Sequence, residues 1–371
     1  MLIYTVLSFL FLSLYIFSVF YWLKGWRKLQ DFSNTDNCDI QLSVIIPYRN
    51  EAKNLPKLIN SLLNQTISND RVEFIFVNDH SIDNGEDMVL NASNEHSAVV
   101  SMKLDINELG KKTAIAKGIA QSRFKIIVTI DADCEPLPSW LTSIASYWNM
   151  YSPKLLVGPV VMRGNKSFFQ SFQQLEFMSL VSASAGSLGQ GRPLMCNGAN
   201  LSFEKKVYLE SAFLLNIEIA SGDDVFLMMA VSKQYDGGVH FLKSKDAVVY
   251  TQVSSTIVEF IRQRMRWTSK APYYSDFYII YTSLLVFLLS FSITVSFLMG
   301  FYDVFYFKLC LLLIVFKSIL DYVFLKSTIR FFGLKQLLIW FFPTQFFYHF
   351  YISFVVLTGI WGKYTWKNRK H

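Results

Sequence analysis

The sequence predicts an α/β domain with a mostly parallel sheet, flanked on both sides by transmembrane helices. Three observations carry this prediction. Apolar, β-branched runs alternate with segments of helical periodicity through the middle of the chain, which is typical of a parallel sheet covered by helices. Of the 371 residues, 52% are hydrophobic and only 17% are charged, which is less charge than soluble domains carry. The apolar excess is concentrated towards the two ends.

The first element is an apolar helix over residues 2–23, which contain no charge and are followed by Lys24, Arg27 and Lys28. A helix of this length matches a hydrocarbon core of about 30 Å. A cleaved signal peptide would have a basic stretch before a shorter apolar core and small residues at the cut, and this segment has neither. We therefore expect a retained span, with the basic linker 24–40 and the domain that follows on the cytoplasmic side.

The middle of the chain, 41–270, is expected to fold as one domain. Its strand-like and helix-like segments alternate, at 42–46, 54–65, 72–77, 97–104, 110–122 and 124–130. Ligands of open parallel sheets bind beyond the carboxyl ends of the strands, so the polar residues after the strands form the candidate site. The four cysteines, Cys38, Cys134, Cys196 and Cys310, show no metal-binding spacing and are expected to be reduced thiols.

The C-terminal region, 271–362, is expected to hold two or three more apolar helices, at 278–300, 304–325 and 336–362. The middle one is the weaker span, because Lys308, Lys317 and Asp321 are costly in a membrane unless they pair or reach its surface. If all three helices cross, the basic tail 363–371 lies outside, against the positive-inside tendency. If one lies along the interface, the tail stays cytoplasmic.

Acidic residues follow two predicted strands and open one predicted helix: Asp79, Asp131 with Asp133, and Asp223 with Asp224. The prolines at 136 and 138 predict that the chain turns after the strand that ends at residue 130. Once turned, two hard oxygen ligands suit Mg²⁺ or Mn²⁺ and leave coordination places for phosphates. Each position also fits a purely structural role as a turn, a loop or a helix N-terminus.

The domain ends on the sequence QRMRW at residues 263–267. Two guanidiniums with an aromatic ring suit a diphosphate and a sugar. The region also fits a juxtamembrane helix that contacts anionic headgroups through Arg262, Arg264, Arg266 and Lys270. The two roles are compatible.

In their order these motifs resemble those of the membrane-embedded family-two glycosyltransferases, the group of cellulose, chitin and hyaluronan synthases and ceramide glucosyltransferase. The likeness covers about residues 43–270 and includes IPYRNE at 46–51, NDHS at 78–81, Gly110-Lys111, Asp131-Ala132-Asp133, CNGAN at 196–200, Gly222-Asp223-Asp224 and the 263–267 sequence. It implies a GT-A type sheet, a nucleotide-diphosphate sugar donor (UDP favoured), a divalent metal and inversion at the anomeric carbon.

The resemblance also implies roles for individual residues. The donor would be bound by Pro47, Arg49, Glu51, Asp79, Lys111, Asp131, Gln263, Arg264 and Arg266, with Asp79 on the base. Asp131 and Asp133 would hold the metal. Asp224 would be the general base, with Asp223 supporting it, and Trp267 and Cys196 would contact the acceptor.

The acceptor stays open between two alternatives. We expect first a membrane enzyme of polysaccharide synthesis, although three or four spans are few for a translocation path unless subunits assemble or a partner contributes. The alternative is a lipid glycosyltransferase with a ceramide-, diacylglycerol- or polyprenoid-type acceptor, which needs only an opening on the membrane side. An inactive scaffold or glycan-binding subunit is a more distant alternative.

The chain has a net charge of +7. We expect its excess basic residues to lie at the edges of a membrane, which we expect to be of the bacterial inner-membrane type. Basic residues cluster at 24–28, 262–270 and 363–370, where they would anchor the catalytic domain to the bilayer and match the substrate's charge. No separate basic domain is present, which argues against nucleic-acid binding.

Overall fold

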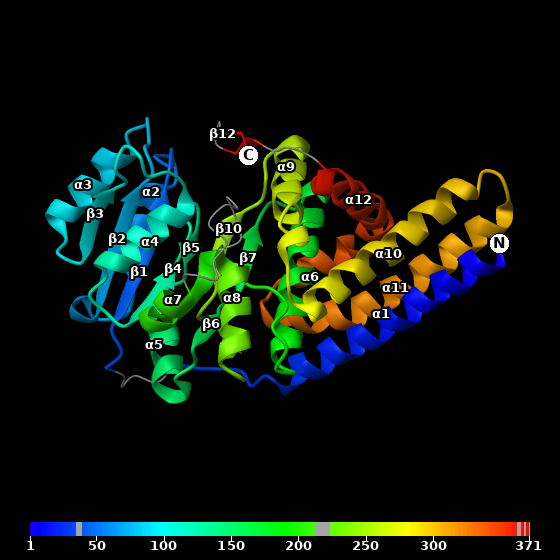
Figure 1. The fold of residues 1–371 in the computed structure, drawn as a ribbon, viewed down its shortest axis with the longest axis horizontal. Coiled ribbons are helices and arrows are strands. Elements are labelled where there is room, and N and C mark those ends of the chain that lie inside the picture. The colour runs from blue at the N-terminus through cyan, green and yellow to red at the C-terminus, as the bar shows by residue number, and fades with distance from the viewer. Residues whose placement is uncertain (35–38, 212–222, 362–364, 367–368, 371) are drawn as a thin grey trace. The chain divides into compact units, whose positions relative to one another are not determined.

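The computed structural model describes all residues except 35–38, 212–222, 362–364, 367–368 and 371 (Figure 1). The chain divides into two compact units that interleave along the sequence. We call them the helical unit (Met1–Lys28, Gly164–Leu194 and Val253–His371) and the sheet unit (Leu29–Arg163 and Met195–Gln252). Residues 164–194 and 253–270, which we expected inside one domain over 41–270, thus lie in the helical unit.

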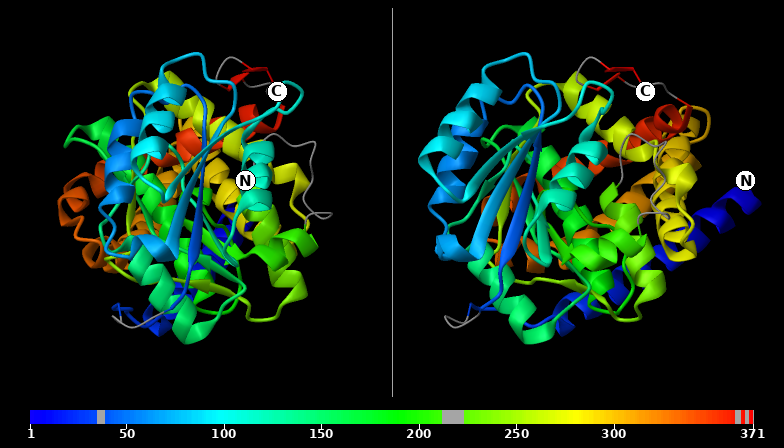
Figure 2. Two further views of the ribbon diagram at one scale, coloured as in Figure 1. Left: turned by 90° about the vertical axis from the view of Figure 1, so that its left-hand side faces the viewer. Right: turned by 60° about the vertical axis from the view of Figure 1, so that its left-hand side comes forward.

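The sheet unit, which Figure 2 shows from two further sides, is built on seven strands in the order β3-β2-β1-β4-β8-β6-β9. Their bounds are β1 Leu42–Tyr48, β2 Val72–Asn78, β3 Val99–Lys103, β4 Ile126–Thr129, β6 Leu155–Val157, β8 Leu201–Glu204 and β9 Val239–Phe241. β3, β2, β1 and β4 are parallel to one another, and β6 is parallel to β9. The predicted α/β fold with a mostly parallel sheet is therefore confirmed.

One strand breaks the parallel pattern. β8 is antiparallel to both of its neighbours, β4 and β6. The sequence did not predict it, because a four-residue run of alternating polarity is too short to distinguish from a loop. A second, smaller sheet has the order β5-β10-β7 and is formed by β5 Glu135–Pro136, β10 Val249–Gln252 and β7 Val160–Arg163.

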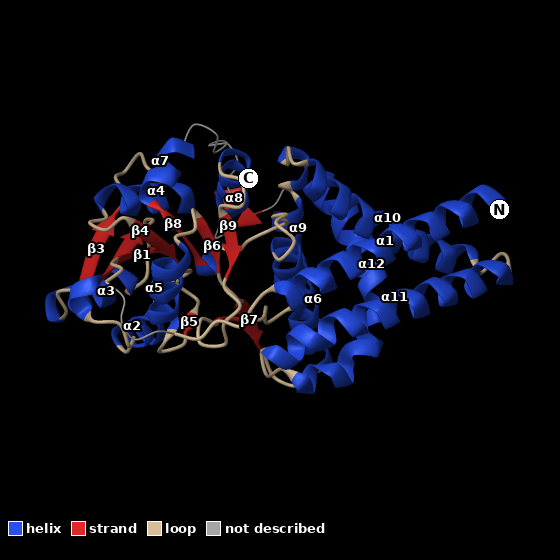
Figure 3. Ribbon diagram, turned by 90° about the horizontal axis from the view of Figure 1, so that it is seen from below, coloured by secondary structure: helices blue, strands red, loops and turns tan. Residues whose placement is uncertain are grey.

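Helices cover both faces of the main sheet, as Figure 3 shows. Their bounds are α2 Leu55–Leu63, α3 Gly85–Glu95, α4 Lys111–Gln121, α5 Trp140–Tyr151, α7 Lys205–Ser211 and α8 Asp223–Gln234. β1, β2 and β4 are buried along their whole length, as expected for central strands enclosed on both faces. The helices and strands predicted between residues 42 and 130 are all present, with ends that differ by a few residues.

The helical unit contains helices from distant parts of the chain. They are α1 Leu2–Lys28, α6 Phe168–Leu188, α9 Ile257–Thr268, α10 Phe277–Met299, α11 Val304–Phe331 and α12 Phe341–Trp361, with the short helix η5 Lys335–Trp340 before α12. Among the described residues, α1 and α10 are long and apolar enough to cross a membrane, by length and composition alone. The expected span 336–362 is thus divided, and its long helix begins only at Phe341.

Two acidic residues define where α10 and α11 begin. The Asp276 carboxylate accepts a hydrogen bond from the Ile279 backbone N–H at 3.0 Å, and the Asp303 carboxylate accepts one from the Phe305 N–H at 2.9 Å. Both side chains satisfy backbone donors that the first helical turn leaves unpaired. No charged residue lies between Asp276 and Asp303 in the sequence. The two acidic residues at the ends of this segment therefore act as helix caps.

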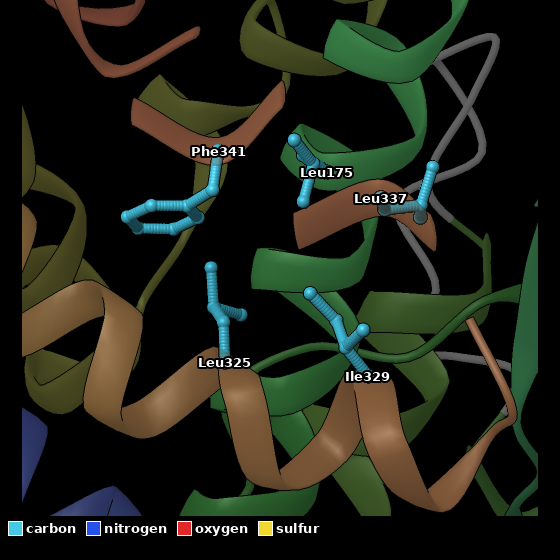
Figure 4. Close-up of a cluster of buried hydrophobic side chains, with 5 residues drawn as sticks. All are labelled: Leu175, Leu325, Ile329, Leu337 and Phe341. Carbon is cyan, nitrogen blue, oxygen red and sulfur yellow. The ribbon is translucent and has the colours of Figure 1, made fainter. Parts of the chain in front are cut away.

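The core of the helical unit joins residues that are far apart in sequence. Leu175 of α6 packs with Leu325 and Ile329 of α11, Leu337 of η5 and Phe341 of α12 (Figure 4). All five side chains are buried. This cluster explains why α6 belongs to the helical unit although it lies between strands of the sheet unit in the sequence.

Two of the charges inside α11, Lys317 and Asp321, are paired within the helical unit. The Lys317 ammonium donates to Asp321 Oδ2 at 2.6 Å, and the Tyr15 hydroxyl of α1 donates to Asp321 Oδ1 at 2.6 Å. Lys317 is 1% exposed and Asp321 7% exposed. Pairing offsets the cost of burying them, so these two charges are compatible with an apolar environment.

α1 and α6 approach each other closely at two glycines. A Cβ at Gly25 would lie 1.8 Å from the carbonyl oxygen of Gly186, and a Cβ at Gly186 would lie 2.4 Å from that of Trp22. Both contacts are with backbone atoms, which cannot move aside without separating the helices. Small residues of this kind allow the backbones of apolar helices to meet.

We expect Gly25→Val to destabilise the helical unit, because its side chain would force α1 away from α6. The free energy of unfolding should fall by about 2–3 kcal/mol, as for other overpacked contacts. Thermal unfolding of the detergent-solubilised protein measures the loss. The matched control is Ser13→Val, which places the same side chain on the exposed face of α1. Equal stability of the two variants would contradict the close crossing.

Candidate functional site

The carboxyl ends of β2, β1 and β4 lie at one edge of the sheet. Tyr48, which ends β1, pairs with Asn78, which ends β2. Thr129, which ends β4, pairs with Ile45 of β1. The strand order reverses between β1 and β4, and ligands of open α/β sheets bind at such switch points. The polar residues that follow these three strands are Arg49, Asp79 and Asp131.

Asp79 is held by the end of β1. Its backbone N–H donates to the Tyr48 carbonyl at 2.9 Å, and Arg49 Nη1 donates to its carbonyl oxygen at 2.7 Å. The same Nη1 lies 3.8 Å from Asp79 Oδ1, and Asp79 is buried. The next residue, His80, turns the chain with a left-handed φ of 55°. The structure thus brings together Arg49 and Asp79, two residues predicted to bind the nucleoside.

The other two predicted nucleoside residues have local structural contacts. Pro47 is buried within β1. The Glu51 carboxylate accepts a hydrogen bond from the Asn54 side chain at 2.6 Å, just before α2. Glu51 is partly exposed, so its position at the start of α2 is fixed while part of the side chain faces solvent.

The Lys111 ammonium donates a hydrogen bond to Asp131 Oδ1. α4 begins at Lys111, directly after Gly110, whose φ of +95° favours glycine. Both side chains are about one-third exposed, so this ion pair lies at the surface of the site and not in the core. The carboxylate that follows β4 therefore lies where a positive charge is favoured.

Asp133 is exposed, and its Oδ1 accepts a hydrogen bond from Cys134 Sγ at 3.7 Å. Burial, followed by the charges of Asp133 and Asp131, raises the pKa of the Cys134 thiol well above its usual value. Cys134 is therefore a protonated thiol at neutral pH. Among the described residues, no group of three or more His, Cys, Asp and Glu side chains is placed to hold a metal.

Asp224 lies in the first turn of α8, and both of its carboxylate oxygens accept backbone hydrogen bonds. The Gly198 N–H donates to Oδ2 at 3.0 Å and the Val225 N–H donates to Oδ1 at 2.9 Å. A Cβ at Gly198 would lie 3.7 Å from Asp224 Oδ2 and 3.9 Å from Lys111 Nζ. Gly198 thus lies close to Asp224, the predicted base, and to Lys111. Lys111 in turn contacts Asp131, the predicted metal ligand.

Part of the predicted Gly222-Asp223-Asp224 motif lies outside the residues that the structure describes. α8 begins at Asp223, but the Asp223 side chain and all of Gly222 are not described. The supporting role of Asp223 therefore stays a prediction.

Asn200 fixes the loop that carries Gly198. Its Oδ1 accepts a hydrogen bond from the Trp140 indole N–H at 2.9 Å, and its Nδ2 donates to the carbonyls of Pro159 and Ala247, both at 2.9 Å. Asn200 is 1% exposed. The Thr129 hydroxyl donates to the Gly198 carbonyl at 2.7 Å. The end of β4 and a buried amide thus hold this loop from two sides.

Cys196, at the start of the same loop, is a buried cysteine that forms no disulfide. Its predicted contact with the acceptor stays a prediction. The sequence marked this loop only by its resemblance to a family motif, and the contact of Gly198 with Asp224 is a function of backbone geometry that no residue pattern indicates.

The QRMRW sequence lies on α9, in the helical unit. α9 begins with a capping box, in which the Thr256 and Glu259 side chains pair with each other's backbone N–H groups. Gln263, Arg266 and Trp267 are partly exposed. The described residues therefore include all five members of the sequence, on one regular helix.

Arg264 is the buried member of this sequence: the residue is 2% exposed, and its guanidinium is paired with Glu176 of α6. Lys270 is also buried, whereas Arg262 is exposed. Of the four basic residues predicted to contact lipid headgroups, Arg264 and Lys270 therefore have buried side chains. No sequence motif marks Glu176, which lies 88 residues before its partner.

Comparison with known proteins finds a family similarity over just under half of the chain. Residues 43–213 match the model of the family described as Glycosyl transferase family 2. The GT-A-like fold is supported by a mannosyltransferase from Pyrobaculum calidifontis, solved in complex with GDP-Man and Mn²⁺. That structure is similar over 96% of this chain and 97% of its own, with a TM-score of 0.59 and 16% sequence identity.

Two curated relatives match a shorter stretch. A dolichyl-phosphate beta-glucosyltransferase from Trichomonas vaginalis is 32% identical over 104 residues, which are 26% of this chain and 32% of the relative. The glycosyltransferase AglE of Haloferax volcanii is 31% identical over 100 residues, which are 27% of this chain and 33% of the relative. The chain thus matches about a third of the length of these relatives.

We expect Asn200→Asp to destabilise the sheet unit, because it removes two buried donors and introduces a buried charge beside two carbonyls. The free energy of unfolding should fall by about 3 kcal/mol or more, at about 1–3 kcal/mol for each group left unsatisfied. Chemical denaturation measures it. The control is Asn64→Asp, the same change at an exposed position, which should leave stability unchanged. A small effect at both positions would contradict the structural role of Asn200.

Proposed function

We propose that the protein is a metal-dependent, inverting glycosyltransferase that moves a sugar from a nucleotide-diphosphate donor to a membrane-associated acceptor. The observation that carries the proposal is the convergence of Asp131, Lys111 and Asp224 around Gly198, at the carboxyl edge of the parallel sheet. The family 2 match and the GT-A-like fold support the same chemistry.

The donor's nucleoside is assigned to the ends of β1 and β2. Arg49 and Asp79 already contact each other there, and Pro47 and Glu51 are their neighbours in sequence. A buried carboxylate at the end of a strand suits the N–H groups of a base. The resemblance favours uracil, whereas the similar mannosyltransferase was solved with GDP-Man, a guanine nucleotide, so both nucleotides belong in the test.

A divalent cation fits Asp131 and Asp133. Their carboxylates are the hard oxygen ligands that Mg²⁺ and Mn²⁺ prefer, and the Lys111 ammonium on Asp131 indicates that positive charge is favoured there. The similar mannosyltransferase is described in complex with Mn²⁺, which supports a metal of this class. When bound, such an ion supplies positive charge next to the leaving diphosphate. Lys111 would contribute to the same neutralisation.

Asp224 is assigned as the general base. Its carboxylate would take the proton from the acceptor hydroxyl while that oxygen attacks the anomeric carbon from the face opposite the diphosphate. The new C–O bond forms as the bond from the sugar to the diphosphate breaks, which inverts the anomeric centre and releases the nucleoside diphosphate. The backbone N–H groups of Gly198 and Val225 fix the orientation of the carboxylate.

The remaining predicted residues are assigned to the diphosphate of the donor and to the acceptor. Gln263 and Arg266 would bind the diphosphate, because a guanidinium and an amide donate to phosphate oxygens. Trp267 would stack on a sugar of the acceptor. The apolar helices α1 and α10 support attachment to a membrane, with the sheet unit on the cytoplasmic side, as the basic residues at the C-terminal end of α1 favour.

The acceptor distinguishes two versions of this function. A glycan hydroxyl is the first, and it would require a translocation path to which a partner or a second copy contributes. A lipid acceptor is the second, and the name of the Trichomonas vaginalis relative, which contains dolichyl phosphate, favours it. A phosphate oxygen is already ionised at neutral pH and requires no base, whereas a hydroxyl does.

The direct test is to incubate membranes that contain the protein with labelled UDP- and GDP-sugars, with Mn²⁺, with Mg²⁺ or with a chelator. We expect label to be transferred from one donor, and transfer to stop when the metal is removed. Label in the organic extract identifies a lipid acceptor and label in high polymer a glycan. Label in neither fraction with any donor would contradict the proposal.

We expect Asp224→Asn to lower kcat for a hydroxyl acceptor by at least about 100-fold, the usual contribution of a general base. The amide oxygen can still accept from Gly198, so binding of the nucleoside diphosphate should be unchanged by calorimetry. With a lipid phosphate acceptor the loss should be much smaller. The control is Asp70→Asn, at an exposed position. Parallel loss of nucleotide binding and transfer would argue against the assigned role.

A further inference from the structure

Arg264 lies in the middle of the QRMRW sequence, yet its side chain is directed into the helical unit. Its Nε lies 3.2 and 3.1 Å from the two carboxylate oxygens of Glu176, and its Nη2 donates to Glu176 Oε2 at 2.6 Å. The Tyr351 hydroxyl of α12 donates to Glu176 Oε1 at 3.2 Å. The three residues tie α9 to α6 and α12, and both charged side chains are buried.

The same guanidinium contacts two other members of the sequence. Its Nη1 donates to Gln263 Oε1, and its Cζ lies 4.1 Å from the centroid of the Trp267 ring. An amide next to an arginine must present its oxygen, because arginine has only donors. The Gln263 NH₂ group is therefore directed away from Arg264, where it can donate to an anion. Phe177 packs against Trp267, with ring centroids 6.1 Å apart.

A buried ion pair is a weak source of stability, because desolvation of the two charges offsets their attraction. Pairs of this kind can instead fix a particular geometry. Only arginine can contact a carboxylate through two nitrogens, an amide oxygen through a third and an aromatic ring through its face. The contacts of Arg264 with Glu176, Gln263 and Trp267 use all three capacities at once.

We infer that Arg264 is a positioning residue, and that Glu176 holds its guanidinium so that it orients the Gln263 amide and the Trp267 ring for the transfer reaction. The inference rests on the proposed function, because it assumes that these two side chains contact donor and acceptor. It replaces the predicted direct contact of Arg264 with the diphosphate. Glu176 becomes part of the site's support without touching a substrate.

The helical unit offers a matched control in Lys317 and Asp321. This pair is also buried, and its described contacts are with Tyr15 and Tyr348, not with residues 263–267. Replacing either pair by apolar residues of similar size removes two buried charges together, which usually preserves stability. Replacing Arg264 and Glu176 removes a contact from Gln263 and Trp267, whereas replacing Lys317 and Asp321 does not.

The test compares Glu176→Leu/Arg264→Met with Lys317→Met/Asp321→Leu. We expect both to unfold thermally near the wild-type temperature. The first should lose about 100-fold in kcat, as misplaced reacting groups do, with unchanged affinity for the nucleoside diphosphate. The second should keep its kcat. Arg264→Lys, which keeps the charge but not the fork, should lose kcat like the first variant. Wild-type kcat in a stable Glu176→Leu/Arg264→Met protein would overturn the inference.

A second readout does not require activity. In protein labelled with 5-fluorotryptophan, the ¹⁹F resonance of Trp267 is assigned by its absence in Trp267→Phe. We expect this resonance to shift or broaden in Glu176→Leu/Arg264→Met and to be unchanged in Lys317→Met/Asp321→Leu. An unchanged Trp267 resonance in both would overturn the inference. If the two double variants show the expected resonances but the wild-type protein transfers no sugar, the proposed function is contradicted. The positioning of Trp267 by Arg264 is then still supported.

Discussion

The candidate site depends on the parallel pairing of β2, β1 and β4. Parallel strands end at the same edge of a sheet, so the residues that follow them are neighbours in space although tens of residues separate them in sequence. Asp79 and Asp131 gain their positions in this way. The antiparallel β8 then returns the chain along β4, and the loop before it places Gly198 against Asp224. Without the shared edge, the acidic residues would be unrelated surface groups.

The two units handle charge in different ways. In the sheet unit, the ion pair of Lys111 with Asp131 stays partly exposed, so water screens it and a substrate can exchange with it at low cost. In the helical unit, the pairs of Arg264 with Glu176 and of Lys317 with Asp321 are buried. Breaking a buried pair leaves an uncompensated charge. The pair of Lys111 with Asp131 can therefore adapt to a substrate, whereas the two buried pairs of the helical unit are fixed.

The sequence predicted those features that depend on local patterns. Strand and helix periodicity between residues 42 and 130 located β1 to β4, α2 and α4 but not α3, and the strand ends located Asp79 and Asp131. The partner of Arg264 was not predictable, because Glu176 lies on α6, a helix that the sequence did not predict, and nothing in the sequence indicates which charge it meets. The contact of Gly198 with Asp224 depends on a loop held by Asn200, whose three hydrogen bonds reach distant segments. Long-range side-chain pairing leaves no periodic signal.

The interleaving of the two units constrains how the chain can fold during synthesis. Residues 164–194 are made between two parts of the sheet unit, but Leu175 packs against Leu325 and Phe341, which leave the ribosome much later. An apolar face of α6 and the Glu176 carboxylate therefore stay exposed to solvent during synthesis, while β8, β9 and β10 complete the sheets. Contacts of such large sequence separation form slowly and leave aggregation-prone surface exposed. The nascent chain is thus prone to aggregation until α11 and α12 have been synthesised and cover α6.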